Sequence, residues 1–175
     1  LQPLRETAVN MPRNGFKAAL AQDATQYGIW AGFATGYAAE IVAGLGYDWM
    51  LIDGEHAPNT VPSVLNQLQT VAPYTTAPVV RAVNGDASLI KQLLDVGAQT
   101  LMIPMVETAE QAQALVRAMR YPPHGIRGVG GGLTRATRWD GVKNYLNTAH
   151  EDLCLLLQVA PTLGAEHGQA LPADE

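Results

Sequence analysis

Five short apolar runs alternate with helix-like segments along this chain, and this alternation limits the possible folds more than any other feature. The apolar runs are predicted strands at residues 27–31, 49–53, 79–82, 100–105 and 153–159. Between them, apolar residues recur three or four positions apart, as in helices, at residues 36–44, 61–71, 88–96 and 108–119. Strands that are apolar throughout and joined by helices predict an α/β fold with a parallel sheet covered on both faces.

Composition limits the classes of partner. The chain has 175 residues, 47% of them apolar and 15% charged, which predicts one globular domain. Its net charge of -5 is spread along the sequence, so no binding of nucleic acid or of an anionic membrane is expected. The single cysteine, Cys154, lies in an apolar run and is expected to be a small core residue rather than a nucleophile. With no signal-like or long apolar segment, the predicted location is cytoplasmic.

Polar side chains gather where the predicted strands end. The stretch MLIDGEHAPN places Asp53, Glu55 and His56 directly after the second strand, Arg81 closes the third, and Gln158 lies near the end of the fifth. In parallel α/β folds, active sites form beyond the carboxyl ends of the strands. The first strand continues into FATGY without the glycine pattern of a dinucleotide site. The pattern therefore favours a (β/α) barrel.

Each candidate residue also has a simpler explanation. His56 could be a solvated loop residue, but a histidine that directly follows a strand and two carboxylates is typical of a general base. Arg81 could form a surface ion pair, yet an arginine at the strand end directs its planar guanidinium to where a carboxylate or enolate oxygen would lie. Asp95, at the end of a helix-like segment, has no role that composition alone would assign. We interpret the glycine-rich residues 125–132 as an active-site loop, because they lack the lysine and hydroxyl of a phosphate-binding loop.

The lysines help to separate two mechanisms for a carbonyl substrate. A Schiff base requires a lysine desolvated among apolar groups. Lys17, Lys91 and Lys143 all lie in polar, helix-like contexts, and none follows a predicted strand. The sequence therefore favours a metal Lewis acid acting together with an imidazole base.

Four motifs in order carry a family resemblance: MLIDGEHAPN, PVVR, IKQLLDVGAQTLMIPMV and RYPPHGIRGVGGGLTRATRW. Together they resemble the HpcH/HpaI family of class II, metal-dependent 2-oxo-acid aldolases, from about residue 16 to residue 159. The resemblance implies a (β/α)8 TIM barrel, a homo-oligomer and a divalent metal (Mg²⁺, Mn²⁺ or Co²⁺). It also implies a small 2-oxo acid as substrate.

The resemblance assigns roles to particular residues. His56 matches the general base, Asp95 the acid that raises its basicity, and Arg81 the arginine that stabilises the enolate. Gln158 matches a glutamine that contacts the substrate, and Asp53 and Glu55 are expected to hold metal-bound waters. Where the family has a metal-ligating glutamate this chain has Ala160, and a second ligand, an aspartate, is expected beyond the sequence given.

These matches give an expected domain organisation and function. Residues 1–15 are expected as an N-terminal extension, 16–159 as an incomplete barrel of about five βα units, and 160–175 as an aberrant tail. The expected reaction is retro-aldol cleavage of 4-hydroxy-2-oxoheptanedioate to pyruvate and succinic semialdehyde, since GLTRATRW favours that branch. Two alternatives stay open: an aldolase for 2-keto-3-deoxy sugar acids, and a non-catalytic truncated remnant.

Overall fold

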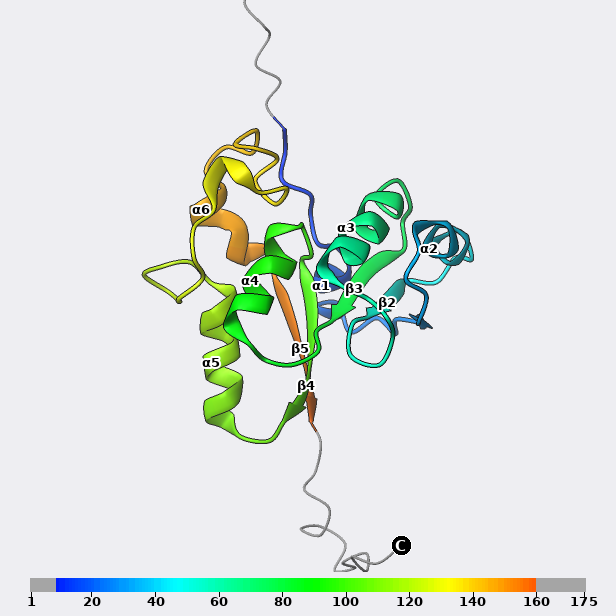
Figure 1. Cartoon of the computed structure of the whole chain (residues 1–175), viewed down its shortest axis with the longest axis horizontal. Coiled ribbons are helices and arrows are strands. Elements are labelled where there is room, and N and C mark those ends of the chain that lie inside the picture. Colours follow the sequence, from blue (N-terminus) through cyan, green and yellow to red (C-terminus); the bar gives the residue numbers. More distant parts are fainter. Residues whose placement is uncertain (1–8, 160–175) are drawn as a thin grey trace, which may run out of the picture.

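The computed structural model describes residues 9–159 and contains a five-stranded parallel sheet (Figure 1). The strands pair in chain order, each with the next, which is the arrangement of consecutive βα units in a barrel wall. Their bounds are β1 (Gly28–Ala31), β2 (Trp49–Asp53), β3 (Ala77–Arg81), β4 (Thr100–Val106) and β5 (Cys154–Val159). The expected α/β fold is confirmed, and the open sheet is consistent with an incomplete TIM barrel.

Four longer helices follow the first four strands and cross the view of Figure 1 from right to left in chain order. They are α2 (Gly36–Ala43), α3 (Val61–Thr70), α4 (Ala87–Asp95) and α5 (Ala109–Met119). Short side chains explain where several of them begin: Thr35, Asp86 and Thr108 each accept a hydrogen bond from a backbone N–H of the first turn. These helices agree with the sequence prediction to within one or two residues.

The alternation of side chains along each strand divides the core into two parts. Met50 and Ile52 of β2 face the layer of helices and belong to the large cluster that includes Leu68 and Leu94. Leu51, between them, points to the other face, where it packs with Phe16. Residues 50–53 of β2 are buried on both faces, which explains why this strand is apolar up to its last residue.

The shorter helices were not expected from the sequence. They are α1 (Gly15–Leu20) and α6 (Tyr145–Thr148), with two 3-10 turns, η1 (Gly131–Leu133) and η2 (Ala149–Glu151). Each spans fewer than two full turns, too short to show a helical apolar period. No helix among residues 9–159 has the length and apolar character that spanning a membrane requires.

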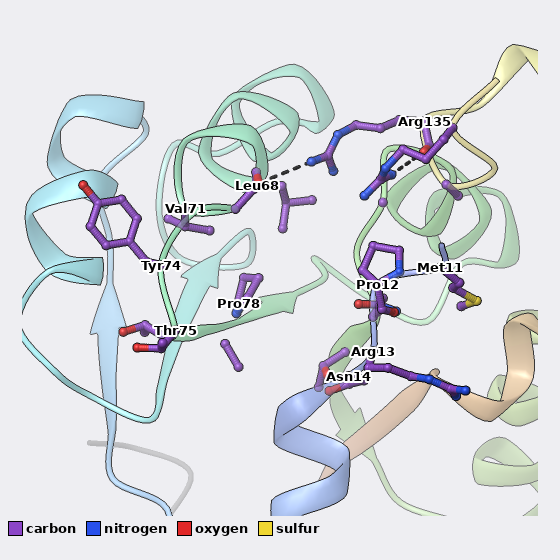
Figure 2. A pocket seen from close by; sticks show the side chains of 18 of the residues that line it. Met11, Pro12, Arg13, Asn14, Leu68, Val71, Tyr74, Thr75, Pro78 and Arg135 are labelled. Atoms are coloured by element: carbon purple, nitrogen blue, oxygen red, sulfur yellow. Dashed lines mark hydrogen bonds between the residues drawn. The ribbon is translucent and has the colours of Figure 1, made fainter. Parts of the chain in front are cut away.

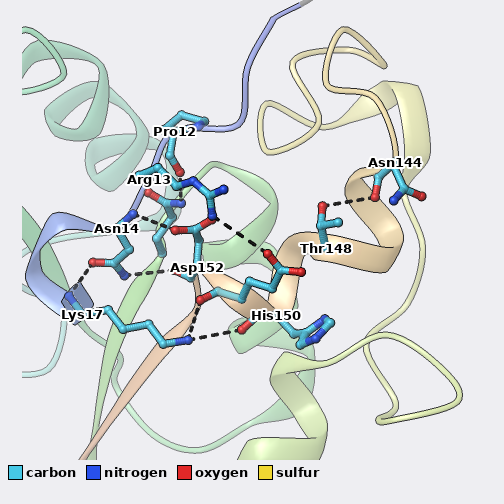
Figure 3. Close-up of polar contacts among 10 residues, drawn as sticks. Pro12, Arg13, Asn14, Lys17, Asn144, Thr148, His150 and Asp152 are labelled. Carbon is cyan, nitrogen blue, oxygen red and sulfur yellow. Dashed lines mark hydrogen bonds and ion pairs between the residues drawn. The ribbon is translucent and has the colours of Figure 1, made fainter. Parts of the chain in front are cut away.

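The described part of the expected N-terminal extension is joined to the sheet (Figure 3). Asn14 caps α1, donates its backbone N–H to Asp152 Oδ1 (2.9 Å), and donates its side-chain amide to Thr100 Oγ1 (2.9 Å). Arg13 Nη1 lies 3.2 Å from Asp152 Oδ2. These contacts link the start of the described chain to the starts of β4 and β5, and the boundary expected at residue 16 stays a prediction.

Candidate active site

Two neighbouring strands place an aspartate and an arginine opposite each other at their carboxyl ends. Asp53 is the last residue of β2, Arg81 is the last residue of β3, and the two are register partners in the sheet. Arg81 Nε donates to Asp53 Oδ1 (2.9 Å) and Nη2 donates to Oδ2 (2.7 Å). Both residues are buried. Such a two-point contact fixes the plane of the guanidinium as well as its position.

The third nitrogen of the guanidinium reaches two further candidates. Arg81 Nη1 lies 2.8 Å from Glu55 Oε2 and donates a longer hydrogen bond, 3.3 Å, to Gln158 Oε1 on β5. The structure thus brings together four residues that the sequence singled out: Asp53, Glu55, Arg81 and Gln158. Both acids contact the arginine directly, and their expected role in holding metal-bound waters stays a prediction.

The turn after β2 depends on Asp53 and on a glycine. Asp53 Oδ1 accepts the backbone N–H groups of Glu55 (2.9 Å) and His56 (3.3 Å), so it orders the segment that carries both candidates. Gly54 donates its N–H to the backbone oxygen of Arg81 (2.9 Å). A Cβ added at Gly54 would lie 2.6 Å from that oxygen. Only glycine lets the turn approach β3 this closely.

Electrostatics keep this pair ionised. Burial alone raises the pKa of Asp53, but the hydrogen bonds from Arg81 and from the backbone of Glu55 and His56, together with the positive charge of Arg81, outweigh burial and lower the pKa to about 2. The hydrogen bond to Asp53 and the nearby carboxylates raise the pKa of Arg81. The site therefore presents a fixed cation over the whole neutral pH range.

Two supporting residues escaped the sequence analysis. Trp30, in β1, lies with its ring centroid 5.3 Å from Arg81 Cζ, a cation–π contact. Asn59 donates to the backbone oxygen of Asp53 (2.8 Å) and accepts a hydrogen bond from the buried Gln67 (2.7 Å). The signal for Asn59 was its place at the end of MLIDGEHAPN, whereas nothing in the sequence linked Trp30 to an arginine two strands away.

His56 and Asp95, expected as partners, have other neighbours in the structure. The imidazole of His56 is exposed, and its Nε2 lies 3.6 Å from Glu55 Oε1. Asp95 Oδ1 instead accepts a hydrogen bond from Arg127 (2.7 Å), whose side chain is fully buried. No hydrogen bond joins His56 to Asp95 among residues 9–159. The roles of both residues stay predictions, and for Asp95 the observed contact indicates a structural role first.

The residues that the structure describes do not supply a metal site by themselves. Within residues 9–159, no group of three or more His, Cys, Asp or Glu side chains could hold a metal ion. Asp53 and Glu55 turn carboxylate oxygens to Arg81, whereas Mg²⁺ requires about six oxygen ligands. The divalent ion that the resemblance implies therefore does not fit these residues alone. Ala160, the position at which a ligating glutamate was expected, lies outside the described residues.

Comparison with known sequences identifies similar proteins. The profile of the HpcH/HpaI aldolase/citrate lyase family matches residues 26–167. A hydroxypyruvate/pyruvate aldolase of Delftia acidovorans is 70% identical over 167 residues, or 95% of this chain and 62% of that protein. A 2-keto-3-deoxy-L-rhamnonate aldolase of Klebsiella pneumoniae is 54% identical over 158 residues, or 90% of this chain and 59% of that protein.

Comparison of structures gives the same result. A solved structure of an HpcH/HpaI aldolase/citrate lyase family protein from Burkholderia cenocepacia superposes with a TM-score of 0.79 at 38% sequence identity. The match covers 89% of this chain and 61% of that one. The chain thus spans about three-fifths of the length of the proteins that it matches.

Proposed function

Because the chain belongs to the HpcH/HpaI aldolase/citrate lyase family, we propose that it carries part of the active site of an aldolase that cleaves a carbon–carbon bond next to a 2-oxo acid. The observation that carries the proposal is the guanidinium of Arg81, which Asp53 holds in one plane at the mouth of the sheet. Cleavage places negative charge on the oxygen of an enolate. A cation fixed in advance stabilises that charge without having to reorganise.

Arg81 has the remaining donor capacity that this role requires. Asp53 accepts hydrogen bonds from Nε and from one N–H of Nη2, whereas Glu55 and Gln158 contact Nη1. The second N–H of Nη2 has no acceptor among residues 9–159. The bond to Gln158, 3.3 Å long, is the weakest of the set and the easiest for a substrate oxygen to replace.

His56 is the proposed base. Its ring is exposed on the turn that Asp53 orders, beside the carboxylate of Glu55. In the cleavage direction, the imidazole removes the proton of the substrate hydroxyl, which becomes the carbonyl oxygen of the aldehyde product. The electron pair of the broken carbon–carbon bond passes to the 2-oxo acid as its enolate, which is protonated to pyruvate or hydroxypyruvate.

The similar proteins favour one of the substrate classes left open by the sequence. They are named hydroxypyruvate/pyruvate aldolase and 2-keto-3-deoxy-L-rhamnonate aldolase, and both names support the sugar-acid alternative better than 4-hydroxy-2-oxoheptanedioate. We therefore propose 2-keto-3-deoxy sugar acids, or the aldol products of hydroxypyruvate, as substrates. The run GLTRATRW was insufficient to distinguish between these substrate classes.

The test compares the two substrate classes on the chain and on two histidine variants. With Mn²⁺ in the buffer, a coupled dehydrogenase follows pyruvate release from 2-keto-3-deoxy-L-rhamnonate and from 4-hydroxy-2-oxoheptanedioate. We expect a higher kcat/KM for the sugar acid and a loss of about 10²–10⁴ in kcat for His56→Ala. His150→Ala, an exposed histidine before β5, is the matched control.

Three outcomes would contradict this proposal. A preference for the heptanedioate would restore the first substrate expectation, and equal rates for His56→Ala and His150→Ala would remove His56 from the mechanism. No pyruvate from either substrate, in a chain that circular dichroism shows to be folded, would favour the non-catalytic alternative.

A further inference from the structure

A cavity lies at the end of the sheet where β3 and β4 begin (Figure 2). Its volume is about 410 Å³, within the usual range of small-molecule sites. Ala77 and Pro78, the first residues of β3, form part of its wall, and so does Thr100, the first residue of β4. Because a strand rises about 3.3 Å per residue, the length of β3 separates this cavity from Arg81 by about 13 Å.

Among residues 9–159, the charged side chains that line this cavity are all positive. They are Arg13, Arg135 and Arg138, and no described aspartate or glutamate lines it. Arg13 already pairs with Asp152. Within the described residues, neither Arg135 nor Arg138 has a carboxylate within 4.0 Å. In a chain whose net charge is -5, a concave site with two uncompensated cations is unusual and favours an anionic ligand.

Neutral oxygens hold both guanidinium groups without cancelling their charge. Arg135 Nη1 donates to the backbone oxygen of Val96 (2.9 Å) and Nη2 to that of Leu68 (3.4 Å), the contact drawn across the top of Figure 2. Arg138 donates to the backbone oxygen of Arg135. Burial and the charge of Arg138 lower the pKa of Arg135, as expected for neighbouring cations without a counter-ion. A guanidinium has five N–H donors, so both arginines keep donors for a ligand.

We propose that this cavity binds the phosphate group of a small metabolite through Arg135 and Arg138. A phosphomonoester carries between 1.5 and 2 negative charges at about pH 7, which matches two uncompensated cations. Its oxygens accept paired N–H donors from a guanidinium, and a point charge would not provide that geometry. Thr75, also in the lining, adds a hydroxyl with no hydrogen-bond partner among residues 9–159. This site is separate from the proposed aldolase chemistry.

The experiment titrates the 175-residue chain with inorganic phosphate at constant ionic strength, set with sodium chloride. Two-dimensional NMR of the arginine Nε–H groups reports binding directly and requires no catalytic activity. We expect saturable shifts of Arg135 and Arg138 in the millimolar range, and about tenfold weaker binding for Arg138→Gln. Arg117→Gln, an exposed arginine on α5, should bind phosphate as the unmodified chain does.

Arg135→Lys tests the geometry apart from the charge, and Arg81→Lys tests the location. Weaker binding in Arg135→Lys, with binding retained in Arg81→Lys, would support the proposal. It would be overturned by the absence of saturation, by equal affinity in Arg138→Gln and Arg117→Gln, or by loss of binding in Arg81→Lys alone. The last result would place the anion in the candidate active site. If Arg135→Lys fails to fold, Arg138→Gln and its control still decide the outcome.

Discussion

Asp53 and Arg81 end adjacent strands in register, and the carboxylate meets the guanidinium at two points, with donor–acceptor distances of 2.9 and 2.7 Å. The same carboxylate accepts the backbone N–H groups of Glu55 and His56. One aspartate therefore orients the cation of the candidate site and the turn that carries its candidate base. A substitution at either member of the pair should affect stability as well as activity.

Arg81→Ala should destabilise the chain by about 3–5 kcal/mol, because it leaves the buried Asp53 and the partly buried Glu55 without their counter-charge. Arg81→Lys should recover part of that stability, since it restores the charge. It should recover little activity, because an ammonium cannot make the two-point contact. Urea unfolding and pyruvate release measure the two effects. A lysine variant with most of the original activity would show that charge alone is sufficient.

The lowered pKa of Asp53 predicts a stability change in acid. The carboxyl has a pKa of about 2 in the folded chain, against an ordinary value of 3.8. The unfolded chain therefore takes up this proton at a higher pH than the folded chain. The contribution, about 2 kcal/mol, is complete above about pH 5 and is lost as the pH falls through 3.8 toward 2. Unfolding free energies of the chain and of Asp53→Asn, measured from pH 6 to pH 2, should converge in that window, and parallel curves would contradict the prediction.

Gly54→Ala should destabilise the turn after β2 by about 1–3 kcal/mol, the usual cost of forcing an extra carbon into a packed site. The added Cβ would lie 2.6 Å from the backbone oxygen of Arg81, and a strand cannot move away as a flexible side chain can. Gly15→Ala is the matched control, because a Cβ there meets no atom within 4 Å. Thermal unfolding compares the two variants. Equal melting temperatures would show that the turn is able to relax.

The sequence predicted the strands and longer helices because their signals are local. The apolar run of β2 and the helical period of α4 can each be read within about ten residues. It also placed Asp53 and Arg81 at one edge of the sheet, since the carboxyl ends of neighbouring parallel strands lie together, but it did not predict that the two residues would pair. It could not predict the contact of Trp30 with Arg81, because side-chain direction across strands depends on tertiary packing.

Asp95 shows that the partner of a residue cannot be predicted from its own sequence context. Its position in IKQLLDVGAQ was matched correctly to a helix end, but a residue's partner depends on which loop packs there. In this structure that loop includes residues 125–132, and its Arg127 donates a hydrogen bond to Asp95. An arginine in a glycine-rich loop is normally solvated, so the burial of Arg127 could not be predicted from the sequence.

Among the described residues, only Asp95 forms a hydrogen bond or ion pair with the side chain of Arg127. Its side chain is fully buried, and its Nε and Nη1 have no hydrogen-bond partner within residues 9–159. Asp95 binds Nη2, and the ring of Tyr121 lies 4.5 Å from Cζ. Removing the carboxylate would leave a buried cation with only an aromatic face beside it.

Asp95→Ala should therefore destabilise the chain by about 3–5 kcal/mol, the cost of removing one partner of a buried ion pair. Arg127→Met should cost less, because methionine fills similar space without a charge to desolvate. Adding Asp95→Ala to Arg127→Met should then cost little more, since no buried cation remains. Urea unfolding of the two single variants and the double variant measures this coupling. Additive losses, combined with a shifted acidic limb of the pH–rate profile in Asp95→Ala, would instead indicate that Asp95 acts on His56 as the family resemblance implies.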